Sequence, residues 1–314
     1  MSVPRLPPGL TVIVRGWLHG NVVVLAGDRP ALFDTGYCTG AAETIRLLES
    51  TTGAPAEALE AIYLTHVHSD HAGGCAALRD RAPGCVIHGH RRCQELAASW
   101  DQRGLWLDGT GQEMPRFGID RVLEPGDELE AGGLRWQVVE LPGHATGGLG
   151  FFNDRWRLLV GGDALWRDGV GALRPQVDGG QVFSEALLAL ERIEALGAEV
   201  VIPGHGEPFS DVGAALERAR RRVVSWRDDP EAHKQSLLRG LVAFWVLGHE
   251  GAASTALEGI VTALMSHLGD ADHGTDDRWL HTMWSQLEAS GVVRREGDRV
   301  YPGARILEAT PDRR

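Results

Sequence analysis

Residues 61–71 read Ala-Ile-Tyr-Leu-Thr-His-Val-His-Ser-Asp-His, an apolar run followed at once by three imidazoles and a carboxylate. The apolar run is typical of a buried strand. Loops at strand ends carry the functional sites of many α/β proteins. Imidazole nitrogens together with a carboxylate suit zinc and other borderline divalent ions better than calcium or magnesium. We therefore predict a metal site at the end of this strand, with four candidate ligands: His66, His68, Asp70 and His71.

Three further candidate ligands follow later strand-like runs. His144 lies in Pro-Gly-His, Asp163 in Gly-Gly-Asp, and His205 in Pro-Gly-His-Gly. Glycines beside each ligand let the backbone turn sharply and approach an ion closely, because glycine tolerates positive φ. Taken singly, each of these side chains could equally be a buried, hydrogen-bonded residue.

Strand-like and helix-like segments alternate around these motifs. Residues 99–120 show no clean period, carry two tryptophans and are predicted to pass over the site. Alternation of strands and helices favours an α/β layer fold. We predict strands within residues 10–33 and over 61–64, 85–87, 134–139, 148–152, 157–160 and 199–202, and helices over 40–52, 72–81 and 182–196.

The pattern changes beyond Asp211. Helical periods run through 214–227, 232–248, 253–268 and 277–290, and a strand, a two-residue turn and a second strand close the chain. We place the boundary between two domains at Asp228-Asp229-Pro230. We predict a catalytic domain over 1–229 and a small helical, winged-helix-like domain over 230–314.

Composition excludes several classes of protein. The 314 residues are 43% hydrophobic and carry a formal charge of −12, which is ordinary for a globular protein. The sequence has neither a bilayer-spanning apolar run nor an apolar N-terminal signal, so we expect no membrane partner and a cytoplasmic location. Residues 231–314 hold 9 basic and 12 acidic side chains, which makes a nucleic-acid partner unlikely. The four cysteines form no C-x-x-C pair and are expected to be free thiols.

The four motifs, in their order, resemble the metallo-β-lactamase superfamily over roughly residues 10–210. The resemblance implies a four-layer αβ/βα sandwich with two metal ions at one edge. Phe33-Asp34-Thr35-Gly36 is similar to the family's D-T-G turn, where Asp34 would orient a ligand. The implied ligands are His66, His68 and His144 for the first metal and Asp70, His71 and His205 for the second, with Asp163 bridging both.

The bridging aspartate narrows the choice among the branches of the superfamily. The best-known zinc β-lactamases carry a cysteine ligand in that region, and no cysteine of this chain lies near Asp163. The sequence instead resembles the glyoxalase II, lactonase and ribonuclease branches. The C-terminal part resembles the winged-helix appendage of an endoribonuclease of the same superfamily.

The resemblance implies a hydrolase in which two Zn²⁺ ions, or iron or manganese in their place, activate a bridging hydroxide. Asp70 would orient this nucleophile as well as bind metal. A small thioester or ester is the favoured substrate. An endoribonuclease or phosphodiesterase, a lactonase, a mononuclear iron dioxygenase of the persulfide type and a metal-binding regulator without catalysis are the alternatives.

Three residues are our candidates for the substrate lining: Tyr37, which follows the Asp-Thr-Gly turn, and Trp166 and Arg174, which follow Asp163. Each is equally compatible with a structural role, because tryptophan is often a core or lid residue. Trp100, Trp106 and Arg167 are weaker candidates of the same kind. We expect a small-molecule substrate and consider a homodimer a candidate assembly, with the C-terminal helices covering the active-site edge or a dimer interface.

Overall fold

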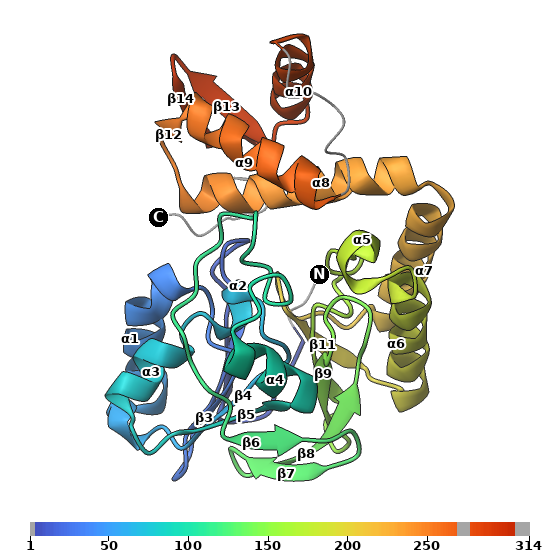
Figure 1. Cartoon of the computed structure of the whole chain (residues 1–314). Coiled ribbons are helices and arrows are strands. Elements are labelled where there is room, and N and C mark those ends of the chain that lie inside the picture. Colours follow the sequence, from blue (N-terminus) through green and yellow to red (C-terminus); the bar gives the residue numbers. More distant parts are fainter. Residues whose placement is uncertain (1–3, 269–276, 305–314) are drawn as a thin grey trace.

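The computed structural model describes residues 4–268 and 277–304 of the chain, and two β-sheets packed face to face form its centre (Figure 1). The first sheet has the order β1-β2-β3-β4-β5-β6 and the second the order β11-β10-β9-β8-β7. Their strands are β1 (Leu10–Ile13), β2 (Val22–Leu25), β3 (Ala31–Phe33), β4 (Ala61–Tyr63), β5 (Val86–His90), β6 (Arg121–Leu123), β7 (Glu128–Ala131), β8 (Leu134–Glu140), β9 (Leu149–Asn153), β10 (Leu158–Gly162) and β11 (Val200–Pro203).

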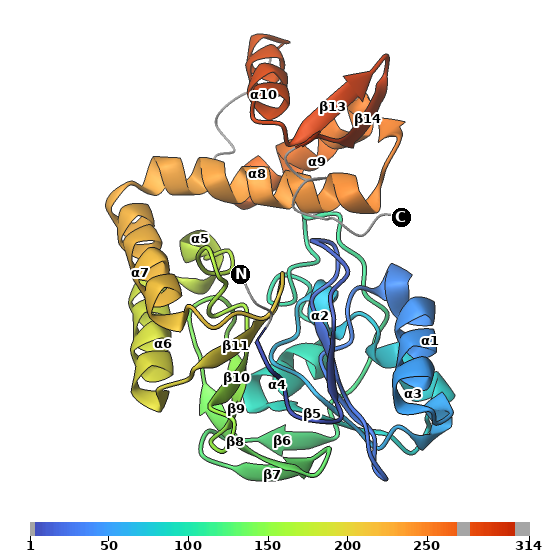
Figure 2. The same cartoon turned by 180° about the vertical axis from the view of Figure 1, so that it is seen from behind.

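Helices cover the outer face of each sheet, which completes the four layers of the predicted sandwich (Figures 1 and 2). Short 3-10 turns at Cys38–Gly40 and Ala56–Ala58 flank the first helix. The helices of this part are α1 (Ala41–Thr52), α2 (Ser69–Ala72), α3 (Cys75–Arg81), α4 (Arg91–Ser99), α5 (Pro175–Asp178), α6 (Val182–Leu196) and α7 (Val212–Asp228).

The strands pack on both faces because their side chains alternate. Val24 of β2 contacts the helix-covered core with Leu48 of α1 and Leu78 of α3. Its neighbour Val23 faces the second sheet and joins Phe151 in the core between the sheets. A strand covered on both sides needs apolar residues at every position, and β2 is buried throughout.

Strand direction brings the motif loops to one edge. β3, β4 and β5 are parallel, and β8, β10 and β11 run in a common direction. Strands that run in one direction end at the same edge of their sheet. The loops after β3, β4, β8, β10 and β11 carry Asp34, the 66–71 cluster, His144, Asp163 and His205.

The C-terminal part begins at Asp229, where Pro230 starts a new helix after α7. α8 (Pro230–Gly248) lies across the edge that carries the motif loops (Figure 1). A separate hydrophobic core joins it to the rest of this part and includes Trp245, Leu257 and Val300. The remaining elements are β12 (Ala252–Ala253), α9 (Ser254–His267), α10 (Asp277–Ala289), β13 (Val293–Glu296) and β14 (Arg299–Pro302), whose strands form a sheet of order β12-β14-β13.

Some local predictions differ from the structure. The helix expected over 72–81 begins only at Cys75, because α2 ends at Ala72 and Gly73 and Gly74 separate it from α3. Position 73 has no room for a side chain, since a Cβ there would overlap the Ser69 carbonyl oxygen and lie 2.6 Å from the Cys38 nitrogen. The four cysteines are free, as expected. Within the described ranges, no helix has the length and apolarity needed to cross a bilayer.

Candidate metal centre

The seven side chains predicted as ligands converge at the shared sheet edge. They are all buried, although five are imidazoles and two are carboxylates. Within each of two groups, the candidate ligand atoms lie within 4.8 Å of one another. The groups are His66, His68 and His144, and Asp70, His71, Asp163 and His205.

The first group presents three ring nitrogens to one point. Nε2 of His144 lies 2.9 Å from Nδ1 of His68 and 3.3 Å from Nε2 of His66. Two nitrogens bound tetrahedrally to zinc at ~2.0–2.1 Å are ~3.3 Å apart. The spacing of these imidazoles therefore fits a single metal ion.

Hydrogen bonds fix which ring nitrogens carry a hydrogen. Nδ1 of His144 lies 2.8 Å from the Ala172 carbonyl oxygen, which can only accept, so this nitrogen is the donor. The Thr65 hydroxyl donates to Asp34, so its oxygen accepts from Nδ1 of His66 at 3.0 Å. In a neutral imidazole, a hydrogen on one nitrogen leaves a lone pair on the other. His66 and His144 therefore direct Nε2 lone pairs toward each other.

The second group surrounds a buried nitrogen. Nε2 of His71 has no hydrogen-bond partner among the described residues and lies 3.5 Å from Oδ1 of Asp163 and 3.7 Å from Oδ2 of Asp70. Nε2 of His205 is 3.0 Å from Oδ2 of Asp70. A buried nitrogen between two carboxylates without a hydrogen bond is unfavourable unless a cation occupies the space. This arrangement fits a second metal ion.

Asp163 belongs to the second group but also faces the first. Its Oδ2 is 3.4 Å from Nε2 of His144 in the first group and 3.8 Å from Nε2 of His205 in the second. Its Oδ1 accepts a hydrogen bond from the Trp166 indole at 3.0 Å. The carboxylate is therefore placed where a ligand shared by two ions would be.

The charges of the site favour a divalent cation. Burial lowers the pKa of His66 and of His68 well below the usual imidazole value, so both rings are neutral. Burial raises the pKa of Asp163, but His205, His71 and His144 outweigh it and hold this pKa well below its ordinary value. Burial lowers the pKa of His71, but Asp70, Asp163 and Asp34 outweigh it and hold this pKa well above its ordinary value. A metal ion bound there would take the place of this proton, since metal binding requires a neutral imidazole.

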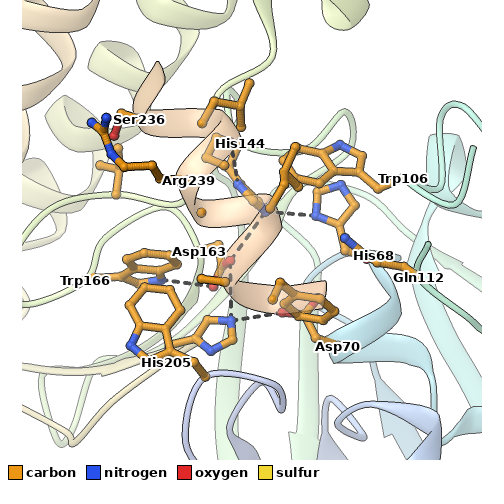
Figure 3. Close-up of a pocket in the computed structure, with 18 of the residues that line it drawn as sticks. His68, Asp70, Trp106, Gln112, His144, Asp163, Trp166, His205, Ser236 and Arg239 are labelled. Atoms are coloured by element: carbon orange, nitrogen blue, oxygen red, sulfur yellow. Dashed lines mark hydrogen bonds and ion pairs between the residues drawn. The ribbon is translucent and has the colours of Figure 1, made fainter. Parts of the chain in front are cut away.

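A cavity of about 390 Å³ adjoins these residues. His68, Asp70, His144, Asp163 and His205 line its metal-side wall. Figure 3 shows Trp106 and Gln112 next to His68, while Trp166, Arg239 and Ser236 lie on the opposite side. Part of the opposing wall comes from α8 and comprises His233, Ser236, Leu237, Arg239, Gly240, Leu241, Ala243, Phe244 and Leu247.

A family model described as the metallo-beta-lactamase superfamily matches residues 15–205, more than half of the chain. The chain belongs to the metallo-beta-lactamase superfamily. The match includes all seven residues of the candidate centre and ends at His205. It stops short of α8, which contributes to the same cavity.

Relatives within this superfamily include metallo-hydrolases. Probable metallo-hydrolase YqjP of Bacillus subtilis (strain 168) is 28% identical over 63% of this chain and 71% of its own length. A hydroxyacylglutathione hydrolase of Idiomarina loihiensis is 28% identical over 51% of this chain, and one of Bdellovibrio bacteriovorus is 31% identical over 46%. The chain spans about half the length of these two enzymes, 53% and 47%. Together with the His/Asp site, the relatives support a metal-dependent hydrolase.

Solved structures share the metallo-beta-lactamase fold. A metallo-beta-lactamase family protein from Thermus thermophilus, TTHA1429, has a TM-score of 0.58 at 23% identity and covers 95% of this chain and 100% of its own. TTHA1623, crystallised in a di-iron-bound form, has a TM-score of 0.52 at 29% identity and covers 67% of this chain and 98% of its own. The His/Asp clusters and these relatives suggest a dinuclear metal site.

Asp34 does not line the cavity but holds residues of the metal centre in place by hydrogen bonds. Its Oδ2 accepts hydrogen bonds from Nδ1 of His71 at 2.8 Å and from the Thr65 hydroxyl at 2.7 Å. Its Oδ1 accepts one from the Thr65 backbone at 2.8 Å. The residue has φ of +57°, which is uncommon outside glycine and costs conformational energy. One carboxylate thus orients His71 directly and His66 through Thr65.

Asp34→Asn is expected to weaken metal binding about 10- to 100-fold, the range seen when a residue that orients a ligand is replaced. The amide keeps the size of the side chain but removes the charge and one acceptor. Competition with a chromophoric chelator measures the affinity. Asp127→Asn is the matched control, because Asp127 accepts a backbone hydrogen bond in an exposed turn. Equal affinities in the two variants would contradict the role given to Asp34.

The candidate lining residues divide into two sets. Trp166 and Trp106 line the cavity. Tyr37 is buried beneath it, where its hydroxyl accepts a hydrogen bond from the Glu113 backbone and its ring contacts Phe244. Arg174 is buried in an ion pair with Asp178, and its guanidinium lies 4.1 Å from the centre of the Trp106 ring. The residues around the cavity do not include Tyr37, Trp100, Arg167 or Arg174.

Other lining residues were not anticipated from the sequence. Trp17, in the loop after β1, stacks on the His205 ring at 5.3 Å and meets Trp166 edge-on at 5.0 Å. The spacing of His233, Leu237, Gly240 and Phe244 on α8 is that of one helix face. That periodicity is visible in the sequence, but it does not say what the face covers.

Proposed function

We propose that this protein uses two divalent metal ions to hydrolyse a small thioester or ester. The observation that carries the proposal is the position of Asp163 between two groups of buried ligand-type side chains that face one cavity. His66, His68 and His144 would hold one ion and Asp70, His71 and His205 the other, with Asp163 shared. Two ions bound there would lower the pKa of a water toward about 7 and so supply a hydroxide at neutral pH.

The chain's own residues then position the reactants. The Asp70 carboxylate lines the cavity, with Oδ2 3.0 Å from Nε2 of His205, so it could also accept a hydrogen bond from the attacking water. Trp166 holds one oxygen of Asp163 by its indole N–H. α8 forms part of the opposite wall of the cavity, where a substrate would contact it.

A cysteine nucleophile is not supported by the structure. Burial raises the pKa of Cys93 to about 12 and that of Cys85 to about 11, and it also raises the pKa of Cys75. The reactive form of cysteine is the thiolate, which such values disfavour. None of the four cysteines lines the cavity. We therefore propose direct hydrolysis without a covalent enzyme intermediate.

The relatives support this proposal at the level of the reaction. Two of them are named hydroxyacylglutathione hydrolases, which is a thioesterase activity. Zinc is our first choice of metal because imidazoles predominate among the ligands. Iron is the second, since TTHA1623 was crystallised with two iron ions.

A product-release assay tests the proposed function. Acyl-glutathione and acyl-CoA thioesters are tested beside a labelled single-stranded RNA and in an oxygen-uptake cell. We expect thioester hydrolysis without oxygen uptake. RNA cleavage that is abolished by Asp163→Ala, with every ester inert, would instead establish the endoribonuclease alternative. Oxygen uptake would indicate iron oxygenase chemistry, and complete inactivity of the metal-loaded protein would leave a regulator.

A further inference from the structure

The cavity has two chemically different ends. Metal-site residues form one end, and Arg239 of α8 lies at the other, away from His68 and Asp70 (Figure 3). Arg222 of α7 is an exposed residue that also lines the cavity. Arg239 is half-buried and has no hydrogen bond or ion pair with any residue that the structure describes. Arg222 contacts the Trp226 ring at 5.9 Å and likewise has no carboxylate partner in the described ranges. A half-buried guanidinium without a counter-charge is a natural anion site.

The position of Arg239 suits a group remote from the reacting bond. In Figure 3 its side chain extends next to Ser236, away from His68 and Asp70. If the anionic group of a substrate bound Arg239, another part of the same substrate would lie against the metal-side wall. Guanidinium binds carboxylate and phosphate equally well in geometric terms, because both offer two coplanar oxygens.

The walls between the two ends are mainly apolar. Four indoles line the cavity, from Trp17, Trp106, Trp166 and Trp226, and Phe244 adds a fifth aromatic ring. The indole N–H of Trp166 is already bound to Asp163, and Gln112 already accepts from the Ser69 hydroxyl at 2.5 Å. Such walls bind apolar and aromatic groups well.

We propose, building on the hydrolase function above, that the substrate is an ester or thioester with an apolar, ring-sized body and one anionic group, a carboxylate or a phosphate, that Arg239 binds. S-lactoylglutathione, a peptide-like thioester with two carboxylates, an amine and two amides, is the contrasting polar case. Arg239 is therefore the residue that selects the charged end of the substrate, and the indoles select its body.

Five thioesters test the proposal. Phenylacetyl thioesters of 3-mercaptopropionate and of 2-mercaptoethyl phosphate place a carboxylate or a phosphate on the leaving thiol. The ethanethiol thioester of 4-carboxyphenylacetate places the carboxylate on the acyl half. The ethanethiol thioester of phenylacetate is neutral, and S-lactoylglutathione is the peptide-like compound. Comparison of the first three identifies the anion and the half that carries it.

Arg239→Gln is expected to raise KM for the preferred anionic thioester about 10- to 100-fold, as for loss of a charge-assisted hydrogen bond, with kcat unchanged. KM for the neutral thioester should change less than about 2-fold, because it has no group for the guanidinium to bind. Arg221→Gln is the matched control, since Arg221 is exposed on α7 and faces Glu217 at 3.7 Å. Equal KM values for the anionic thioester in wild type and Arg239→Gln would contradict the anion-binding role of Arg239. If S-lactoylglutathione were the best substrate, the proposal that the substrate has an apolar body would be wrong.

Binding of a non-hydrolysable thioether analogue separates this proposal from the proposed function. Quenching of tryptophan fluorescence reports its binding, because four indoles line the cavity. If no ester is hydrolysed but Arg239→Gln weakens analogue binding about 10-fold or more, the hydrolase proposal fails and the anion site stands. If hydrolysis is observed and the variant binds as wild type does, the anion site fails and the hydrolase stands.

Discussion

Asp163→Asn is expected to lower kcat/KM for the best thioester by about 10³-fold or more, the scale seen when a member of an interdependent catalytic group is removed. The substitution keeps the size of the side chain and removes the charge that faces His144, His205 and His71. It also replaces one ligand oxygen with an amide nitrogen, which does not bind a metal as a carboxylate does. Steady-state kinetics and metal analysis of the purified variant measure both effects.

Asp154→Asn is the matched control for this experiment. Asp154 is highly exposed and pairs with Arg157 at 3.0 Å in a turn after β9. Exposed ion pairs contribute little, so we expect its activity and metal content to equal those of wild type. Activity of Asp163→Asn within about 2-fold of this control would contradict the shared-ligand role.

Gly204→Ala is expected to reduce activity about 10²-fold or more, because displacing a reacting group by about 1 Å has effects of this size. A Cβ at this position would overlap Oδ1 of Asp163 and lie 2.8 Å from Cε1 of His71. The backbone cannot move away easily, since the Gly204 amide donates to Gly162 at 2.7 Å and its carbonyl accepts from Asn21 at 2.6 Å. The methyl group must therefore displace the two side chains.

Kinetics and circular dichroism distinguish a local effect of Gly204→Ala from unfolding. Gly213→Ala is the control, because Gly213 lies in α7 and a Cβ there meets no atom within 4 Å. Alanine in a helix stabilises by roughly 0.5–1 kcal/mol relative to glycine, so this variant should be fully active and slightly more stable. A Gly204→Ala enzyme as active as Gly213→Ala would show that Asp163 and His71 need not hold their positions.

The candidate centre could be predicted from the sequence because its evidence is local. An apolar strand followed by a cluster of ligand-type residues is visible at Ala61–Tyr63 and again before Asp163 and His205. The convergence of these loops at one edge followed from the family resemblance, because the order and direction of strands in two sheets are not local features of the sequence. The role of Asp34 in orienting metal ligands could also be predicted, because Asp34 lies in a motif that resembles one of the same family.

The opposite wall of the cavity could not be predicted in the same way. The face of α8 that carries Leu237 and Phe244 has a helical period, but a period does not identify the surface that it covers. Tyr37 was expected to line the site because it follows Asp34 closely in sequence. In the structure its hydroxyl is bound to the Glu113 backbone, a contact 76 residues away that local pattern does not reveal.

Titration of the metal-depleted protein with Zn²⁺, and in a parallel anaerobic sample with Fe²⁺, tests the central claim most directly. The rate of thioester hydrolysis is followed as metal is added. We expect no hydrolysis before the first addition and a maximum at two equivalents per chain, one for each group of ligands. Full activity without metal, or a maximum at one equivalent, would contradict a dinuclear hydrolase.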